Sequence, residues 1–213
     1  MKKLLALTAL AALMIAPATR AADRTGFLLG ARAAYAFPFG DAGGVPRFGT
    51  GTVAFDDLVD HAWPLWLELN YRFGPSLELG AYGQYAFTNG GTAFDNGSDI
   101  RAGLQLNYIF APGGMFTPWF GIGGGYEWLK ADRNFDIGNL RQTASSTIRG
   151  WDFMVQAGAD LHAGDRFTLG PFVAMTFGQF GDLKISGLSS ADTNIDDKAW
   201  HEWLQVGVRA TFF

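Results

Sequence analysis

Residues 63–87 read WPLWLELNYRFGPSLELGAYGQYAF, and this stretch decides the fold class. Over 65–73 and 77–87, apolar residues stand at every second position, broken once by Gly83, and mostly polar residues or glycine fill the positions between. A period of two is the pattern of a β-strand with one apolar face. The Gly-Pro-Ser turn at 74–76 joins the two runs, so the stretch predicts an antiparallel hairpin.

The same alternation recurs along the chain in runs of about 11 residues, which is the length that a tilted strand needs to cross a bilayer. Short connections alternate with long ones, as in an up-and-down barrel with short periplasmic turns and long external loops. We therefore predict an all-β fold, an eight-stranded antiparallel up-and-down transmembrane β-barrel. The predicted strands are 27–37, 63–73, 77–87, 100–110, 116–128, 151–161, 167–177 and 200–212, and the predicted long loops are 38–62, 88–99, 129–150 and 178–199.

The composition agrees with this interpretation and excludes other classes. Only 17% of the 213 residues are charged, 29 are glycine and none is cysteine, which excludes disulfides and cysteine-based metal sites. The mean hydropathy of +0.07 is close to zero because strands that alternate lipid-facing and lumen-facing residues average out. The net charge is −4, so nucleic-acid binding has no electrostatic basis.

The N-terminus predicts export. Lys2 and Lys3 precede an apolar stretch at 4–15 that is too short to span a bilayer, and small residues near 16–21 offer cleavage sites. We expect residues 1–22 to be a cleaved signal peptide and residues 23–213 to form the barrel. Removing the signal leaves 13 Lys and Arg against 20 Asp and Glu. A bacterial outer membrane is the expected location, with membrane lipid and lipopolysaccharide as its surroundings.

Aromatic residues are sorted toward the two ends of the predicted strands, as anchoring at the lipid headgroups requires. A water-facing exterior would be rich in Lys and Glu, yet the only lysines after the signal lie in the long loops or at their edges, at Lys130, Lys184 and Lys198. The apolar face is therefore expected to contact lipid. The long-loop end carries Trp63, Trp66, Trp128, Trp151, Trp200 and Trp203, and the short-turn end carries Phe27, Tyr71, Phe73, Tyr108, Phe110, Phe116, Phe167 and Phe212.

These features resemble the small eight-stranded outer-membrane barrels of the OmpA/OmpW/OmpX-like type, over about residues 25–213. The chain ends Gly207-Val208-Arg209-Ala210-Thr211-Phe212-Phe213, and the resemblance implies that Phe212 and Phe213 form a signal for the barrel-insertion machinery. The apolar alternation runs through Phe212 and is one residue out of step with Phe213. The resemblance further implies periplasmic chaperones as partners during biogenesis, and we expect a monomer.

The polar face of the strands carries charges of both signs, which have to pair inside a narrow lumen because an unpaired buried charge is costly. The turn at 74–76 puts Arg72 opposite Glu78, and similar counting puts Arg101 diagonal to Glu127. Such a network predicts a closed, structural barrel, with a narrow water-filled conduit as the alternative. The predicted lumen charges are Arg32, Glu68, Arg72, Glu78, Arg101, Glu127, Asp152, Asp160 and Arg209.

Apolar residues also fall in the inward phase. Trp66, Met154, Phe180 and Trp203 lie toward the long-loop end, and Phe172 lies deeper. The OmpW-like branch suggests that such a patch binds a small hydrophobic molecule at the mouth of the barrel. The alternative is that these side chains fill the lumen and pack beneath the loops.

Enzymatic and metal-dependent functions find little support in the sequence. A lipid A acyltransferase or deacylase needs a nucleophile and a base, but His61 and His201 lie near the long-loop ends of strands two and eight, and His162 lies at the opposite end. The motif Asp192-x-Asn194-x-Asp196 begins like a calcium loop but has Asp197 where the turn glycine belongs. We therefore expect a non-enzymatic, structural or porin-like protein with no metal and no cofactor. The loop serines have no ordering motif, and they are Ser145, Ser146, Ser186, Ser189 and Ser190.

Overall fold

The computed structural model describes residues 25–44, 52–91, 96–110, 112–137, 140–164, 166–186, 191–195 and 197–213. The predicted signal peptide therefore lies outside the described residues, as does Asp196 of the calcium-like motif. Within the described ranges, no helix is long and apolar enough to cross a membrane.

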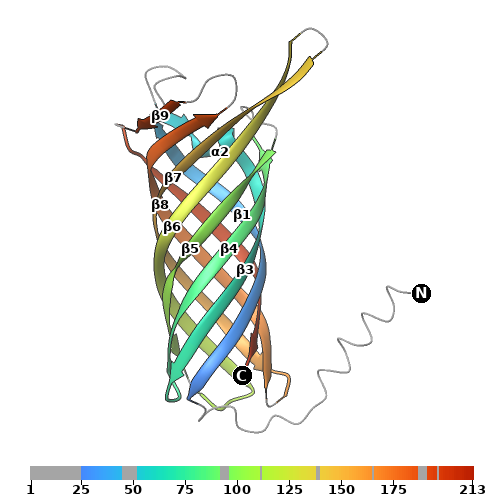
Figure 1. Ribbon diagram of the computed structural model, residues 1–213. Coiled ribbons are helices and arrows are strands. Elements are labelled where there is room, and N and C mark those ends of the chain that lie inside the picture. The colour runs from blue at the N-terminus through green and yellow to red at the C-terminus, as the bar shows by residue number, and fades with distance from the viewer. Residues whose placement is uncertain are drawn as a thin grey trace, which may run out of the picture.

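Eight long antiparallel strands form a closed barrel (Figure 1). Each strand pairs with its neighbours in the chain, and the last strand pairs with both the first and the last but one, which closes the ring without a free edge. The predicted up-and-down barrel is confirmed. Its strands are β1 (Gly26–Gly44), β3 (Val59–Phe73), β4 (Leu77–Gly90), β5 (Asn96–Ile109), β6 (Phe116–Ile137), β7 (Leu140–His162), β8 (Phe167–Ser186) and β10 (Trp200–Phe212).

The strands run further at the long-loop end than the sequence predicts. β1 continues to residue 44 instead of 37, β6 continues to 137 instead of 128, and β7 begins at 140 instead of 151. The ladder of backbone hydrogen bonds does not need an apolar face once the strands leave the hydrocarbon, so alternation of hydrophobicity underestimates their length. Much of the predicted loops 38–62, 129–150 and 178–199 is therefore strand.

Three short elements lie at the same end of the barrel, which is the top of Figure 1. The strands β2 (Thr52–Ala54) and β9 (Ala191–Asn194) extend the sheet beside β1 and β8. The helix α2 (Phe55–Leu58) follows β2 directly and buries Phe55 and Leu58. The segment 52–58 thus folds inward over the mouth of the barrel.

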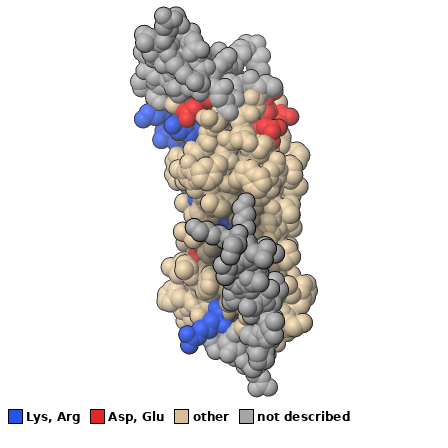
Figure 2. Space-filling view, turned by 90° about the vertical axis from the view of Figure 1, so that its right-hand side faces the viewer, with Lys and Arg blue, Asp and Glu red and all other residues tan. Residues whose placement is uncertain are grey.

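The faces of the sheet are as predicted, with apolar residues outside and polar residues inside. Leu67 and Leu104 on the outer face are 67% and 64% exposed, whereas Glu68 and Arg101 on the inner face are 1% exposed. In Figure 2 the side of the barrel is mostly uncharged, and charged side chains gather mainly toward its two ends. An apolar face of this extent around a closed barrel requires a hydrocarbon environment.

Glycines allow large side chains to cross the lumen. Gly103 on β5 pairs with Gly125 on β6, and a Cβ at either position would lie within 3.0 Å of the Tyr82 hydroxyl and of the facing backbone. The absence of both side chains makes room for the Tyr82 ring. This is why the glycine-rich stretch of β6 stands opposite an aromatic residue.

Candidate functional site in the barrel lumen

Six charged residues form a lower network toward the short-turn end. The pairing of Arg72 with Glu78 is confirmed, since the two residues stand opposite each other and Arg72 Nε donates to Glu78 Oε1 over 2.9 Å. Arg209 joins this pair to the rest of the network, with Nη2 3.3 Å from Glu78 Oε2 and Nε 2.8 Å from Glu68 Oε1. The lower network consists of Arg32, Glu68, Arg72, Glu78, Asp160 and Arg209.

Arg32 completes the lower network. Its Nη2 and Nε donate to the two carboxylate oxygens of Glu68 over 2.7 and 3.1 Å, a bidentate pair. Asp160 lies 3.6 Å from Arg209 Nη1 and accepts a hydrogen bond from Trp119 Nε1. Three guanidinium groups thus face three carboxylates, so the lower network is formally neutral.

A layer of amide side chains lies beside Glu68. Gln105 donates to Asn70 and Gln156 donates to Asn107, each over 2.9 Å, and Gln105 also donates to Glu68. All four amide side chains are buried and fill the lumen at this level, although Nδ2 of Asn70 and of Asn107 donates to no other described residue.

An upper network surrounds Arg101. Its guanidinium lies 2.9 Å from Asp99, 2.8 Å from Glu127 and 3.7 Å from Asp152, and it donates to the Thr176 hydroxyl. Arg101 stands directly opposite Glu127 in the β5–β6 register, so the predicted diagonal placement was wrong by one step of the ladder. The upper network consists of Asp99, Arg101, Glu127, Asp152 and His201.

His201 contributes to the upper network from β10. Its Nε2 lies 2.7 Å from Glu127 Oε2, and Trp203 Nε1 donates to the other oxygen of Glu127 over 3.2 Å. One guanidinium and one imidazole therefore face three carboxylates. Unlike the lower network, this cluster carries an excess of acid.

The apolar lumen residues divide into two clusters. Trp66, Met154 and Phe172 pack together with Tyr82 and Trp119, and the Arg32 guanidinium lies 4.8 Å from the Trp66 ring. The predicted patch is thus split, because its other two members, Phe180 and Trp203, lie in a separate cluster toward the long-loop end.

The upper apolar cluster is covered by α2. The Phe55 ring lies 5.1 Å from Trp203 and 4.8 Å from His201, and Phe180 stacks on His201 at 3.9 Å between ring centroids. Phe55, Phe180 and Trp203 are at most 1% exposed. The predicted mouth residues are therefore packed against one another rather than open to solvent.

The tryptophans at the long-loop end belong to two groups. Trp63, Trp128, Trp151 and Trp200 face outward, where they can anchor at the lipid headgroups. Trp66 and Trp203 have the opposite phase and are buried in the lumen, so they do not belong to the outer aromatic belt.

The chain terminus closes the short-turn end. Phe212 faces outward against Phe167 at 4.9 Å between ring centroids, whereas the Phe213 ring lies 4.7 Å from the Arg72 guanidinium. The apolar alternation of the last strand ends at Phe212 because Phe213 turns toward the lumen charges.

The three histidines do not share a site. His61 lies on the outer face, where it stacks on Tyr35 and contacts Asp60, while His201 is buried in the upper network. His162 lies at the short-turn end, 6.5 Å from the Phe213 ring. Ser145 on β7 donates to Asp132.

Several lumen residues were missed by the sequence analysis. Asp99 precedes the predicted start of its strand, so its phase was not assigned, and Trp119 falls where the alternation of β6 is loose. Phe55 lies in a predicted long loop, and no periodic signal indicates that it folds back into the barrel. A search for the polar phase beyond the hydrocarbon band would have found Asp99.

Neither a protein-family model nor a curated protein sequence matches the chain. Among solved structures, Neisserial surface protein A is similar with a TM-score of 0.53 and 14% identity, over 87% of this chain and 96% of that one. The outer membrane protein OprG from Pseudomonas aeruginosa is similar with a TM-score of 0.56 and 16% identity, over 89% of this chain and 97% of that one.

This chain has the fold of the small outer-membrane β-barrels. A third structure of this kind, the outer membrane protein AlkL in lipid bilayers, has a TM-score of 0.50 and 15% identity, over 92% of this chain and 94% of that one. The outer-membrane β-barrel described here has the apolar outer face that this fold requires. It is therefore a membrane-spanning protein with this fold.

Proposed function

We propose that this outer-membrane β-barrel is a structural, non-enzymatic protein whose lumen is closed to solutes. The observation that carries the proposal is the continuous filling of the lumen by the lower network, the amide layer, the upper network and the cluster around Phe55. An eight-stranded barrel has an interior just wide enough for side chains. Opening a path would break buried ion pairs, which is costly.

The test is the conductance of the purified protein in a planar lipid bilayer. We expect no steady openings from the wild type, and the same silence from Arg72→Ala, because the neighbouring Arg209 still contacts Glu78. Arg101→Ala is the second variant. It removes the guanidinium that joins three carboxylates of the upper network, and a closed barrel should remain silent in this variant too. Steady wild-type openings of uniform size would contradict the proposal and favour a narrow porin.

A second candidate function is binding of a small hydrophobic molecule at the long-loop end. It is favoured by the aromatic cluster of Phe55, Phe180 and Trp203, which lies beneath a four-residue helix that a ligand can displace. A hydrophobic solute would then quench tryptophan fluorescence, and Trp203→Ala would reduce the quenching. Titrations that leave the fluorescence unchanged would exclude this function.

The non-enzymatic part of the proposal is supported by the contacts of the histidines. His61 contacts Asp60 through Nδ1 and Asn89 through Nε2, and His201 Nε2 bonds to Glu127, so none of these three ring nitrogens bonds to a serine. Mass spectrometry of lipid A from cells with and without the gene is the direct test. A change in acylation would indicate an acyltransferase or deacylase instead.

We also propose that the protein is a monomer that reaches the membrane through a cleaved signal peptide, periplasmic chaperones and the insertion machinery. The outward Phe212 and the terminal Phe213 are the residues proposed for recognition by that machinery. Deleting both should reduce insertion in cells, while Phe27→Ala at the same end serves as a control that leaves the terminus intact.

A further inference from the structure

A notch opens in the outer wall of the barrel between β7 and β8. The register of the two strands shifts here, since Arg149 pairs with Asp182 and Gly150 pairs with Phe180, which leaves Gly181 as an extra residue in β8. A Cβ on Gly181 would point into open space. The notch has a volume of about 470 Å³, and its lining includes Tyr126, Arg149, Trp151, Gln179, Asp182 and Lys198.

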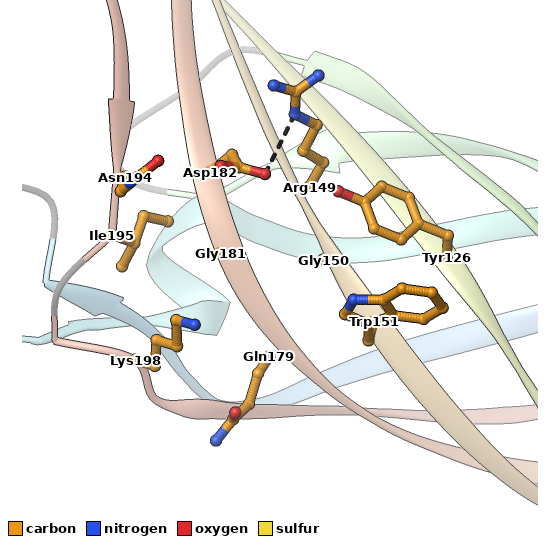
Figure 3. A pocket seen from close by; sticks show the side chains of 10 residues that line it. All are labelled: Tyr126, Arg149, Gly150, Trp151, Gln179, Gly181, Asp182, Asn194, Ile195 and Lys198. Atoms are coloured by element: carbon orange, nitrogen blue, oxygen red, sulfur yellow. Dashed lines mark ion pairs between the residues drawn. The ribbon is translucent and has the colours of Figure 1, made fainter.

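The notch lies at the level of the aromatic belt of the long-loop end. Trp151, one of its walls, is 74% exposed on the outer face and packs edge to face against Tyr126, with 5.3 Å between ring centroids. In Figure 3, these two rings lie on one side of the notch and Ile195, Asn194 and Lys198 lie on the other. Because interfacial Trp and Tyr mark the depth of the lipid headgroups, the notch lies at headgroup depth, and the predicted external position of the long loops assigns it to the outer leaflet.

Basic side chains gather around this notch. The structure describes the side chains of nine Lys and Arg residues. Four of them lie in the lumen networks and Arg166 lies at the short-turn end, so the remaining four lie around the notch. Arg149 and Lys198 line the notch, and Lys130 and Lys184 flank Thr147 on the adjoining row of the ladder. All lysines after Lys3 therefore lie in one corner of the barrel.

Acidic residues lie among these basic ones: Asp182 and Asp132 contact them, Asp192 stands opposite Lys184 in the ladder, and Asp197 precedes Lys198. Asp182 lies 3.5 Å from Arg149 Nε, which is itself buried, and the side chains of both residues are 37% exposed. Asp132 forms a second, partly exposed ion pair, with its carboxylate 3.4 Å from Lys130 Nζ. In the described lining of the notch itself, two cationic groups face a single carboxylate.

We propose that this notch binds the phosphate of an outer-leaflet glycolipid, the chemistry that lipid A presents at this depth. Arg149 offers the planar guanidinium that suits phosphate, and Lys198 offers a second positive charge across the notch. The amide of Gln179 is placed to hydrogen-bond a sugar hydroxyl, while Trp151 and Tyr126 pack against the apolar beginning of the acyl chains. The site is outside the lumen, so it is independent of whether the barrel conducts.

The experiment is native mass spectrometry of the purified protein in detergent, titrated with phosphorylated lipid A, dephosphorylated lipid A or inorganic phosphate. We expect the wild type to bind phosphorylated lipid A at least about tenfold more tightly than the dephosphorylated form, the difference that one charge-assisted contact gives. Inorganic phosphate should not compete at equal concentration. Competition by it would overturn the assignment of a lipid as the occupant.

Four variants separate charge from shape. Lys198→Gln and the pair Arg149→Gln with Lys198→Gln remove charge, and Gly181→Leu fills the notch without changing charge. Each should weaken lipid A binding, the pair and Gly181→Leu by about tenfold or more. Arg166→Gln removes an exposed cation at the opposite end and should bind as the wild type does.

Folding of each variant is checked by the heat-dependent migration that intact barrels show on gels. Lys198 lies outside the strands, so Lys198→Gln keeps the test decisive even when a strand variant fails to fold. Wild-type affinity in both Lys198→Gln and Gly181→Leu, or equal affinity for the two forms of lipid A, would overturn the proposal.

Discussion

Replacing Arg101 by alanine is the sharpest test of the packed lumen. Arg101 is 1% exposed and holds together Asp99, Glu127 and Asp152, with its nitrogens 2.9, 2.8 and 3.7 Å from their carboxylate oxygens. The variant leaves three buried carboxylates near one imidazole. It also removes the hydrogen bond to Thr176 and the packing on the Trp203 ring.

The expected loss follows from the cost of an uncompensated buried charge. Removing one partner of a buried pair destabilises a protein by about 3–5 kcal/mol. At about 1.4 kcal/mol for each factor of ten, this lowers the folding equilibrium constant by two to nearly four orders of magnitude. The upper network should lie toward the larger value, because among the described residues no second guanidinium takes over the role of Arg101 as Arg209 does beside Arg72.

The measurement is reversible urea unfolding in lipid vesicles, followed by tryptophan fluorescence. Arg166→Ala is the control, since an exposed charge at the short-turn end should change the free energy of unfolding by less than about 0.5 kcal/mol. Adding Glu127→Gln to Arg101→Ala removes one of the stranded carboxylates and should restore part of the stability. A loss below about 1 kcal/mol for Arg101→Ala would refute the reasoning, because it would mean that water solvates these carboxylates inside the barrel.

Three further outcomes are expected. Leu67→Arg, in the middle of the lipid-facing surface, should cost about 2–4 kcal/mol in vesicles, whereas Leu67→Phe should be nearly neutral; equal stabilities would contradict a lipid-facing wall. Asp152→Asn should leave the stability unchanged or raise it, because it relieves the acid excess of the upper network, and a loss above about 2 kcal/mol would argue against that excess. Phe55→Ala should uncover Trp203, so that acrylamide quenches its fluorescence more strongly, and unchanged quenching would show that the helix does not cover the mouth.

Much of the candidate site was predictable because the period of two reports which face of a strand a residue occupies. Glu68, Arg72, Glu78 and Arg209 all lie in the lumen as their phase predicts, and the contact of Arg72 with Glu78 followed from the turn between β3 and β4. Which other charges meet depends on the register across the remaining pairs of strands. The prediction counted from loosely defined strand ends, so it placed Arg101 diagonal to Glu127 instead of directly opposite it.

The folding of the long-loop end was not predictable in the same way. The segment that carries Phe55 has no alternation, and its inward position results from contacts with residues distant in sequence, such as Phe180 and Trp203. The notch beside Gly181 arises from a shift of one residue between β7 and β8. Neither feature leaves a periodic trace in the chain.

The sequence by itself determined the number of strands, the direction of each face and the solvent that each face meets. These properties are local, because alternate side chains of one strand point to opposite sides whatever the neighbouring strand does. The tertiary structure alone decided how the lumen charges divide into a balanced and an acidic group, what covers the mouth, and where the outer wall opens. These properties depend on register and on contacts across the closed barrel, which bring together residues far apart in the chain.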